Sequence, residues 1–196
     1  VPQVGPVRHE PGKTIMTSFV TGASGFIGAR VCEILARESS AGDVTCLIRN
    51  PEQAREFEER GFRVIGADLL DLDAYREALV ASERVFHIGA LAALGDGPAY
   101  ERNNGDAPRQ IGDALREAAA LKAFVFTSTM GAVDRTPLDP CDGPLTAETE
   151  PCPQSDYGRS KLRCEELIRR SDLPWVIVRP SWVYGPGMRA QSHIST

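Results

Sequence analysis

Tyr157 and Lys161 stand four positions apart in a stretch whose pattern predicts a helix over residues 157–170. Residues at this spacing leave the same face of a helix, with their Cβ atoms about 5–6 Å apart. A phenol has a pKa of about 10, and a nearby ammonium group lowers that pKa because it stabilises the phenolate. The pair could therefore exchange a proton near neutral pH. The same spacing also arises by chance on many helices. Whether this pair is functional therefore depends on the elements around it.

Three glycines mark a turn in the stretch TGASGFIG, at Gly22, Gly25 and Gly28. Glycine costs backbone entropy, so the turn must need a conformation or a close approach that other residues would block. A helix N-terminus after such a turn offers free N–H groups and a partial positive charge, which bind phosphate. The turn therefore predicts a site for the pyrophosphate of a dinucleotide. A purely structural glycine turn is the alternative interpretation.

Apolar runs alternate with helical patterns along the chain. The predicted strands cover residues 17–21, 44–48, 63–66, 84–88, 123–127 and 175–179, and the predicted helices 26–37, 52–60, 72–81, 107–120 and 157–170. Strands that are apolar throughout are typical of parallel sheets buried on both faces. The sequence thus predicts an α/β fold, a doubly wound Rossmann-type parallel sheet with helices on both faces.

A proline-rich loop over residues 134–156 lies between the fifth predicted strand and Tyr157. Its prolines exclude a helix or a central strand, and we expect the loop to border a substrate pocket. They are Pro137, Pro140, Pro144, Pro151 and Pro153.

The composition narrows the choice of partners. The chain of 196 residues fits one domain, and its net charge of −5 comes without a run rich in lysine and arginine. We therefore expect a small-molecule substrate rather than nucleic acid or a membrane. Five cysteines without a C-x-x-C pair, and three histidines far apart, predict no metal site and a reducing, cytoplasmic location. Residues 1–15 are expected to form a flexible leader.

Six motifs follow one another in order: TGASGFIG at 21–28, Asp68-Leu69, VFHIGA at 85–90, FTST at 126–129, YGRSK at 157–161 and RPSWVYGPG at 179–187. Together they resemble the extended short-chain dehydrogenase/reductases, the NAD(P)-dependent epimerase/dehydratase family, over residues 17 to about 190. The resemblance implies that residues 16–196 form an NAD(P)-binding Rossmann-type domain. It also implies that the family's C-terminal substrate lobe is largely absent from this chain, which stops at Thr196.

The resemblance implies hydride transfer between a nicotinamide cofactor and a carbonyl or secondary alcohol, with three catalytic residues. Tyr157 would give or take the proton, and Lys161 would tune it and donate to the nicotinamide ribose. Thr129 would polarise the substrate carbonyl. Ser128 remains a rival for this last role, because it carries a hydroxyl in the neighbouring position of the motif.

The cofactor contacts also follow from the resemblance. Asp68 would accept from the adenine amino group with Leu69 over the ring, and Arg49 after the second strand would pair with a 2′-phosphate. Arg49 therefore favours NADP(H), with NAD(H) possible. The full set of predicted contacts is Gly22, Ser24, Gly25, Phe26, Ile27, Gly28, Arg49, Asp68, Leu69, Ile88, Gly89, Ala90, Asn103, Thr127, Ser128, Tyr157, Lys161 and Pro180.

Three functions stay open at this point. An oxidoreductase acting on a carbonyl or secondary alcohol leads, because a preference for NADP(H) favours net reduction. A sugar-nucleotide epimerase or dehydratase would use the same step, and a non-catalytic dinucleotide-binding module would need only the fold. The chain keeps the Tyr157–Lys161 pair, which favours an enzyme. A homodimer is possible by analogy with relatives that pair through the helix carrying this tyrosine.

Overall fold

The computed structural model describes residues 16–92, 97–134, 146 and 148–188. Its centre is a six-stranded sheet in the order β3-β2-β1-β4-β5-β6, in which every neighbouring pair is parallel. The strand order changes direction between β1 and β4, where doubly wound sheets open a crevice for ligands. The predicted fold class is confirmed. The strands are β1 (Ser18–Thr21), β2 (Val44–Leu47), β3 (Arg63–Ile65), β4 (Arg84–His87), β5 (Ala123–Thr127) and β6 (Trp175–Val178).

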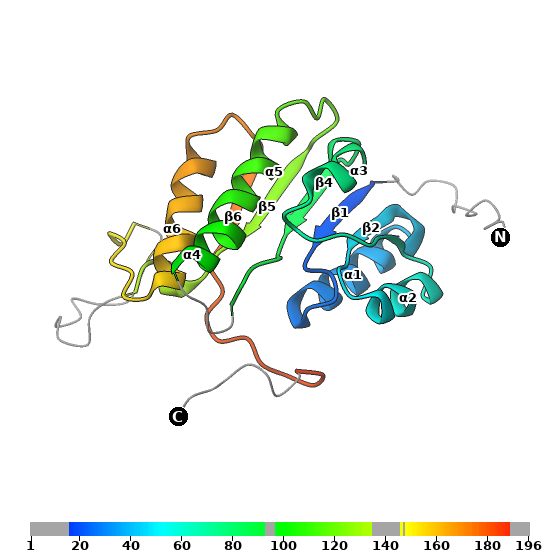
Figure 1. The fold of residues 1–196 in the computed structure, drawn as a ribbon, viewed down its shortest axis with the longest axis horizontal. Coiled ribbons are helices and arrows are strands. Elements are labelled where there is room, and N and C mark those ends of the chain that lie inside the picture. The colour runs from blue at the N-terminus through cyan, green and yellow to red at the C-terminus, as the bar shows by residue number, and fades with distance from the viewer. Residues whose placement is uncertain (1–15, 93–96, 135–145, 147, 189–196) are drawn as a thin grey trace.

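Helices connect the strands, and most begin where the sequence predicts (Figure 1). The helix expected over 72–81 is instead a 3-10 turn followed by a short α-helix. The helix expected over 107–120 ends at Leu115, where the next N–H groups bond to carbonyls three residues back and tighten the chain. The elements are α1 (Phe26–Glu38), η1 (Ala41–Asp43), α2 (Pro51–Glu59), η2 (Leu72–Ala74), α3 (Arg76–Val80), α4 (Gly97–Tyr100), the π-helical η3 (Glu101–Asp106), α5 (Ala107–Leu115), η4 (Met130–Ala132) and α6 (Asp156–Arg169).

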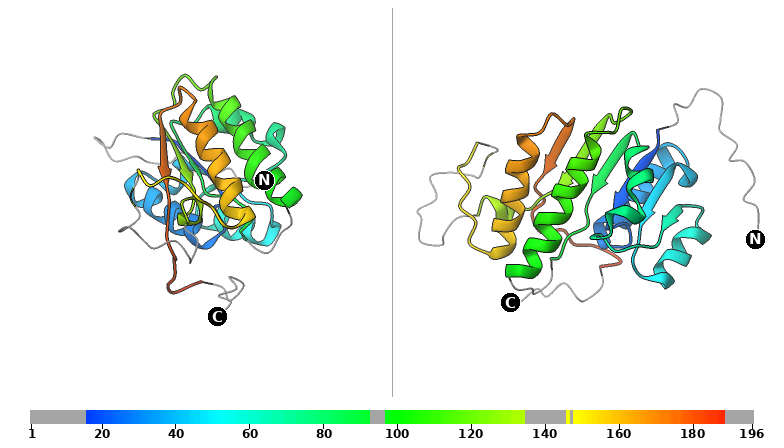
Figure 2. Two further views of the ribbon diagram at one scale, coloured as in Figure 1. Left: turned by 90° about the vertical axis from the view of Figure 1, so that its left-hand side faces the viewer. Right: turned by 45° about the horizontal axis from the view of Figure 1, so that its top comes forward.

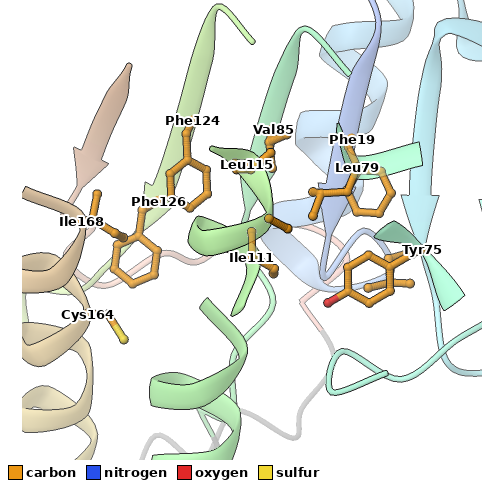
Figure 3. Packing of buried hydrophobic residues seen from close by; sticks show 12 residues of the cluster. Phe19, Tyr75, Leu79, Val85, Ile111, Leu115, Phe124, Phe126, Cys164 and Ile168 are labelled. Carbon is orange, nitrogen blue, oxygen red and sulfur yellow. The ribbon is translucent and has the colours of Figure 1, made fainter. Parts of the chain in front are cut away.

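Two separate apolar cores lie on the two faces of the sheet. Helices cover both of these faces (Figure 2). On one face, Phe19, Val85, Phe124 and Phe126 pack against α3, α5 and α6, as Figure 3 shows for the α5 and α6 contacts. The other core joins β1 and β2 to α1 and α2, and its buried members are Val20, Ala23, Cys32, Leu35, Val44, Cys46, Ile48, Phe57 and Phe62. Both faces of the sheet are therefore covered by helices, as predicted.

The outer strand β6 is covered on one face only in the described part of the chain. Its Ile177 pairs in register with Phe126 and packs on the α5–α6 side. Because side chains alternate along a strand, Val176 and Val178 point to the opposite face, where they are 49% and 44% exposed. The layer made by α1 and α2 thus covers the β1–β2 half of its face.

Three groups of predicted residues lie outside the described residues: the leader over 1–15, Cys141, and the prolines Pro137, Pro140 and Pro144. In the described part, no helix has both the length and the apolar character that a membrane span needs.

Candidate functional site

The predicted site residues gather at one edge of the sheet. Because all six strands run parallel, their carboxyl ends share that edge. The glycine turn follows β1, Arg49 follows β2, and Asp68 follows β3. The stretches Ile88–Gly89–Ala90, Ser128–Thr129 and Pro180 follow β4, β5 and β6 in the same way. The segments that follow all six strands therefore share one edge of the sheet, and those after β1 and β4 flank the point where the strand order changes direction.

The glycine turn is required by close backbone packing. Gly22 has a φ of 67°, a conformation that favours glycine, and a Cβ there would lie 2.6 Å from the Gly89 nitrogen. A Cβ on Gly28 would lie 2.0 Å from the Gly22 carbonyl oxygen. These two glycines let α1 and the end of β4 approach the turn directly. Gly22 and Gly28 are therefore needed for the packing of the backbone itself. This structural role does not exclude that the turn also binds a ligand.

The N-terminus of α1 is suited to bind an anion. It begins after Gly25, its first turn carries no acidic residue, and no described side chain caps it. Its N–H groups and the positive end of its dipole are therefore not neutralised by the described chain. Ser24 and Ile27 are half-buried beside this end, as is Phe26. A diphosphate fits this end of the helix by its charge.

Beyond the ends of β2 and β3, Arg49 and Asp68 lie together. The Arg49 Nη1 lies 3.0 Å from Asp68 Oδ2, while Asp68 Oδ1 accepts the Leu70 N–H at 3.0 Å. These contacts, led by the Leu70 hydrogen bond, lower the pKa of Asp68 below its usual range. The Arg49 side chain is 81% exposed, so it can leave the carboxylate for a phosphate. Leu69, the next residue along the chain, is half-buried, and its carbonyl accepts the Tyr75 hydroxyl.

The structure separates the two rival hydroxyls after β5. Ser128 is 3% exposed, and it lies close enough to the buried Glu165 carboxylate to help lower the pKa of that group. Thr129 is only half-buried and begins η4, where its Oγ1 accepts the Gly131 N–H at 3.1 Å. Only Thr129 of the two is therefore placed to meet a substrate at the sheet edge. Thr127, the last residue of β5, is half-buried beside them.

Tight packing holds the start of α6 against η4. A Cβ on Gly158 would lie 2.2 Å from the Gly131 carbonyl oxygen, and Ser155 caps the helix by accepting the Gly158 N–H at 3.0 Å. Tyr157 is thereby held close to the segment that follows Thr129. Gly158 was missed by the sequence interpretation, although it stands inside the YGRSK motif.

The prediction that Lys161 lowers the pKa of Tyr157 is wrong for this structure. Burial, with a smaller contribution from Tyr100, raises the pKa of Tyr157 above its ordinary value. Lys161 is 1% exposed and its Nζ lies 4.6 Å from the centre of the Phe126 ring. Burial lowers the pKa of Lys161 to about 8, against the opposing effects of Cys164 and Glu165. The phenol therefore remains protonated at neutral pH.

The buried bridging asparagine is Asn104, not Asn103. Asn104 is 1% exposed; its Oδ1 accepts the Leu91 N–H at 2.8 Å, and its Nδ2 donates to the Leu91 carbonyl and to Ser160. It thereby ties the loop after β4 to α6. Asn103 instead donates to the Ala99 carbonyl, four residues earlier in the chain.

The loop after β6 crosses the strand ends toward α1 (Figure 1, orange to red). At one end the Pro180 carbonyl accepts the Met130 N–H at 3.0 Å, and at the other Arg30 Nη2 lies 3.4 Å from the Pro186 carbonyl. Between these anchors Trp182 and Tyr184 are 78% and 82% exposed.

The site offers no cluster for a metal ion. Across the described ranges, no three histidine, cysteine, aspartate or glutamate side chains are grouped so that they could hold one. The groups at this edge are the N-terminus of α1, the Arg49 side chain and the hydroxyls of Thr129 and Tyr157. Positive charge and hydrogen-bond donors of this kind suit a phosphorylated organic molecule.

Comparisons with known proteins agree with this geometry. A family model described as NAD(P)H-binding matches residues 22–193. Ceramide reductase of Caulobacter vibrioides is 27% identical, over 86% of this chain and 46% of its own length. UDP-arabinose 4-epimerase 1 of Arabidopsis thaliana is 28% identical, over 88% of this chain and 43% of its own. The solved UDP-glucuronic acid 4-epimerase of Bacillus cereus in complex with NAD has a TM-score of 0.73 at 28% identity, covering 87% of this chain and 58% of that one. The chain spans about half the length of the curated relatives it matches.

Proposed function

The chain belongs to the NAD(P)H-binding family, with the fold of the extended short-chain dehydrogenase/reductases, and from this we propose that it transfers hydride between NADP(H) and a carbonyl or secondary alcohol. The observation that carries the proposal is the convergence of all six motifs at the carboxyl edge of the sheet. The glycine turn and the Tyr157 helix would thereby face the same crevice.

The residues present fit a nicotinamide dinucleotide. The uncapped start of α1 would hold the pyrophosphate, with Gly22, Gly25 and Gly28 allowing a close backbone approach. Arg49 and Asp68 would hold the adenosine end, and Pro180, whose carbonyl accepts the Met130 N–H, would lie at the nicotinamide end. When bound, the cofactor supplies or accepts the hydride.

The roles proposed for the protein side chains follow from their protonation. Burial keeps the Tyr157 phenol protonated at neutral pH, so it can donate its proton to a substrate oxygen during carbonyl reduction. Thr129 would orient that oxygen by donating a hydrogen bond. Lys161, buried behind them, would carry positive charge near the nicotinamide ribose. A protonated phenol in this position is suited to act as a general acid in carbonyl reduction.

The preference for NADP(H) is tested at Arg49. Replacing it by glutamine should weaken NADPH binding about 10- to 100-fold, because a hydrogen bond to a charged group contributes about 1.5–3 kcal/mol. NADH binding should change little, since NADH lacks the 2′-phosphate. Titration followed by the fluorescence of the reduced nicotinamide measures both affinities. The exposed Arg55→Gln variant on α2 is the matched control, and a wild-type chain that prefers NADH would contradict the assignment.

A sugar-nucleotide epimerase is the second candidate. It is favoured by the likeness to the Bacillus cereus epimerase, whose structure contains NAD. Incubating the chain with UDP-sugars and catalytic NAD, and separately with ketones and stoichiometric NADPH, distinguishes the two reactions. Epimerised sugar without net consumption of cofactor supports the second candidate, and NADPH oxidation coupled to ketone loss supports the first.

The remaining assignments are part of the proposal. The cysteines Cys32, Cys46 and Cys164 are buried free thiols, which supports a reducing, cytoplasmic setting. We further propose that the substrate is a small molecule and that residues 16–196 act as one cofactor-binding domain. Two copies would pair through the face of α5 and α6, where Leu167 is 46% exposed.

A further inference from the structure

The hydroxyl of Thr21, at the end of β1, has all of its hydrogen-bonding groups occupied. Its Oγ1 accepts the N–H of Ile88 at 3.2 Å and that of Gly89 at 3.0 Å, and it lies 2.9 Å from Nδ1 of His87. A hydroxyl has two acceptor sites and one proton. Since the two amides fill the acceptor sites, the proton is donated to Nδ1. The ring of His87 therefore accepts at Nδ1 and carries its own proton on Nε2.

The surroundings of His87 keep this ring uncharged. The side chain is 1% exposed, and burial together with the charge on Lys161 lowers its pKa to about 3. Its ring stacks on that of Phe126, with the centroids 5.7 Å apart and the planes inclined by 12°. Three elements thus meet at His87: β1 with Thr21, β5 with Phe126, and α6 with Lys161.

Phe126 links this pair to the lysine of the proposed site. Its fully buried ring contacts His87, and the Lys161 ammonium lies 4.6 Å from its centre. An ammonium group is attracted to the face of an aromatic ring, and more so away from water. A charged imidazole at position 87 would place a second positive charge beside it. A neutral ring is therefore needed for Lys161 to keep both its position and its charge.

We propose that Thr21 and His87 are positioning residues: Thr21 holds His87 as the neutral Nε2–H tautomer, and His87 with Phe126 forms the uncharged support on which the Lys161 ammonium rests. Neither residue was assigned a role from the sequence. Through them the glycine turn, which begins one residue after Thr21, is mechanically connected to Lys161. The effect on turnover rests on the proposed function, whereas the tautomer and the lysine position do not.

The tautomer is tested by long-range hydrogen–nitrogen NMR of the histidine-labelled chain. The chain has three histidines, and the His87→Phe variant identifies the His87 signals by their loss. We expect protonated Nε2 and unprotonated Nδ1, without titration between pH 5 and pH 8. The Thr21→Ser variant keeps the hydroxyl and should keep this pattern, and Thr21→Val should lose it. A wild-type ring that titrates near its ordinary pKa, or that carries its proton on Nδ1, overturns the proposal even if Thr21→Val does not fold.

The support of Lys161 is tested by the ε-methylene signals of the three lysines, Lys13, Lys122 and Lys161. A side chain over an aromatic ring is shifted upfield, so one lysine should stand apart in the wild type. His87→Asn retains an acceptor for Thr21 but removes the imidazole that stacks on Phe126. If this support holds Lys161 over the Phe126 ring, its loss should move the Lys161 signal toward those of the other two lysines. An unchanged signal overturns the support role, whether or not the chain turns over a substrate.

The kinetic consequence separates positioning from binding. In His87→Asn we expect kcat to fall about tenfold or more while the dissociation constant of NADPH rises by a clearly smaller factor, because Lys161 is only one of several proposed cofactor contacts. Thr21→Ser should retain the wild-type kcat. Equal losses in kcat and NADPH affinity would mean a general loss of structure and would overturn the positioning role. A wild-type chain that binds no NADPH would contradict the proposed function alone.

Discussion

Replacing Tyr157 by phenylalanine should lower turnover about 10²–10⁴-fold, the range that one positioned acid or base contributes. The substitution removes a single oxygen and keeps the ring, whose centroid lies 6.0 Å from that of Tyr100. The fold and the affinity for NADPH should therefore change little. Initial rates of NADPH oxidation with a substrate found in the ketone panel, together with an NADPH titration, measure both quantities.

Tyr100→Phe is the matched control, because it makes the same chemical change in the neighbouring ring. Its turnover should stay close to that of the wild type. The presence of Tyr100 contributes to raising the pKa of Tyr157, so its loss shifts that pKa slightly downward. Turnover that survives in Tyr157→Phe would show that another group supplies the proton, and Tyr157 would lose its assigned role.

The same pKa predicts the pH dependence of the two reaction directions. A raised pKa means that the phenol is protonated throughout the neutral range and below it. Carbonyl reduction, which consumes this proton, should not lose rate through Tyr157 as the pH rises from 6 to 8. Alcohol oxidation needs the phenolate, so its rate should increase with pH over the same range. Rates measured in both directions across this range test the direction of the shift.

Replacing Glu165 by alanine should lower the free energy of unfolding by about 3–5 kcal/mol, the cost of leaving one partner of a buried ion pair alone. Glu165 is fully buried; its Oε1 accepts from Arg179 Nε at 2.9 Å, and its Oε2 accepts from Arg179 Nη2 at 2.6 Å and from Arg169 at 2.8 Å. Burial by itself raises the pKa of Glu165, but the hydrogen bonds from Arg179, the nearby Ser128 hydroxyl and the charges of Arg179 and Arg169 outweigh it, and the net shift is downward.

Urea denaturation of Glu165→Ala beside Glu166→Ala measures this effect. Glu166 is the next residue of α6 and is exposed, so its loss should cost little, while the change in helix propensity is the same. The two variants should thus differ by several kcal/mol at an unchanged denaturant slope. A difference within experimental error would mean that the Glu165–Arg179 pair does not contribute to the free energy of unfolding.

This ion pair also bears on the proposed site. Tyr157, Lys161 and Glu165 follow one another at intervals of four and so share one face of α6. Arg179 directly precedes Pro180, whose carbonyl is bonded to Met130. The pair therefore holds the tyrosine helix against the strand that leads into the loop with Trp182 and Tyr184. Loss of this contact should loosen the site as well as the fold.

The strands, helices, sheet type and glycine turn of this protein can be deduced from the sequence, because they depend on interactions between residues close together in the chain. Runs of apolar residues report strands buried on both faces, and their alternation with helical patterns dictates the parallel sheet. Parallel strands place their carboxyl ends together, so the gathering of six motifs at one edge follows from the order of elements alone. The glycine turn and the i, i+4 placement of Tyr157 and Lys161 are local in the same sense.

Only the tertiary structure decided features that depend on burial and on partners far along the chain. The direction of the Tyr157 pKa shift is set by burial and by Tyr100, and Arg49 pairs with Asp68 nineteen positions away. The choice of Asn104 over Asn103 depends on the backbone of Leu91, and the tautomer of His87 on a hydroxyl 66 positions earlier. Desolvation and hydrogen bonding between distant elements exist only once the sheet has brought these elements together. They therefore cannot be predicted from residue types and spacing alone.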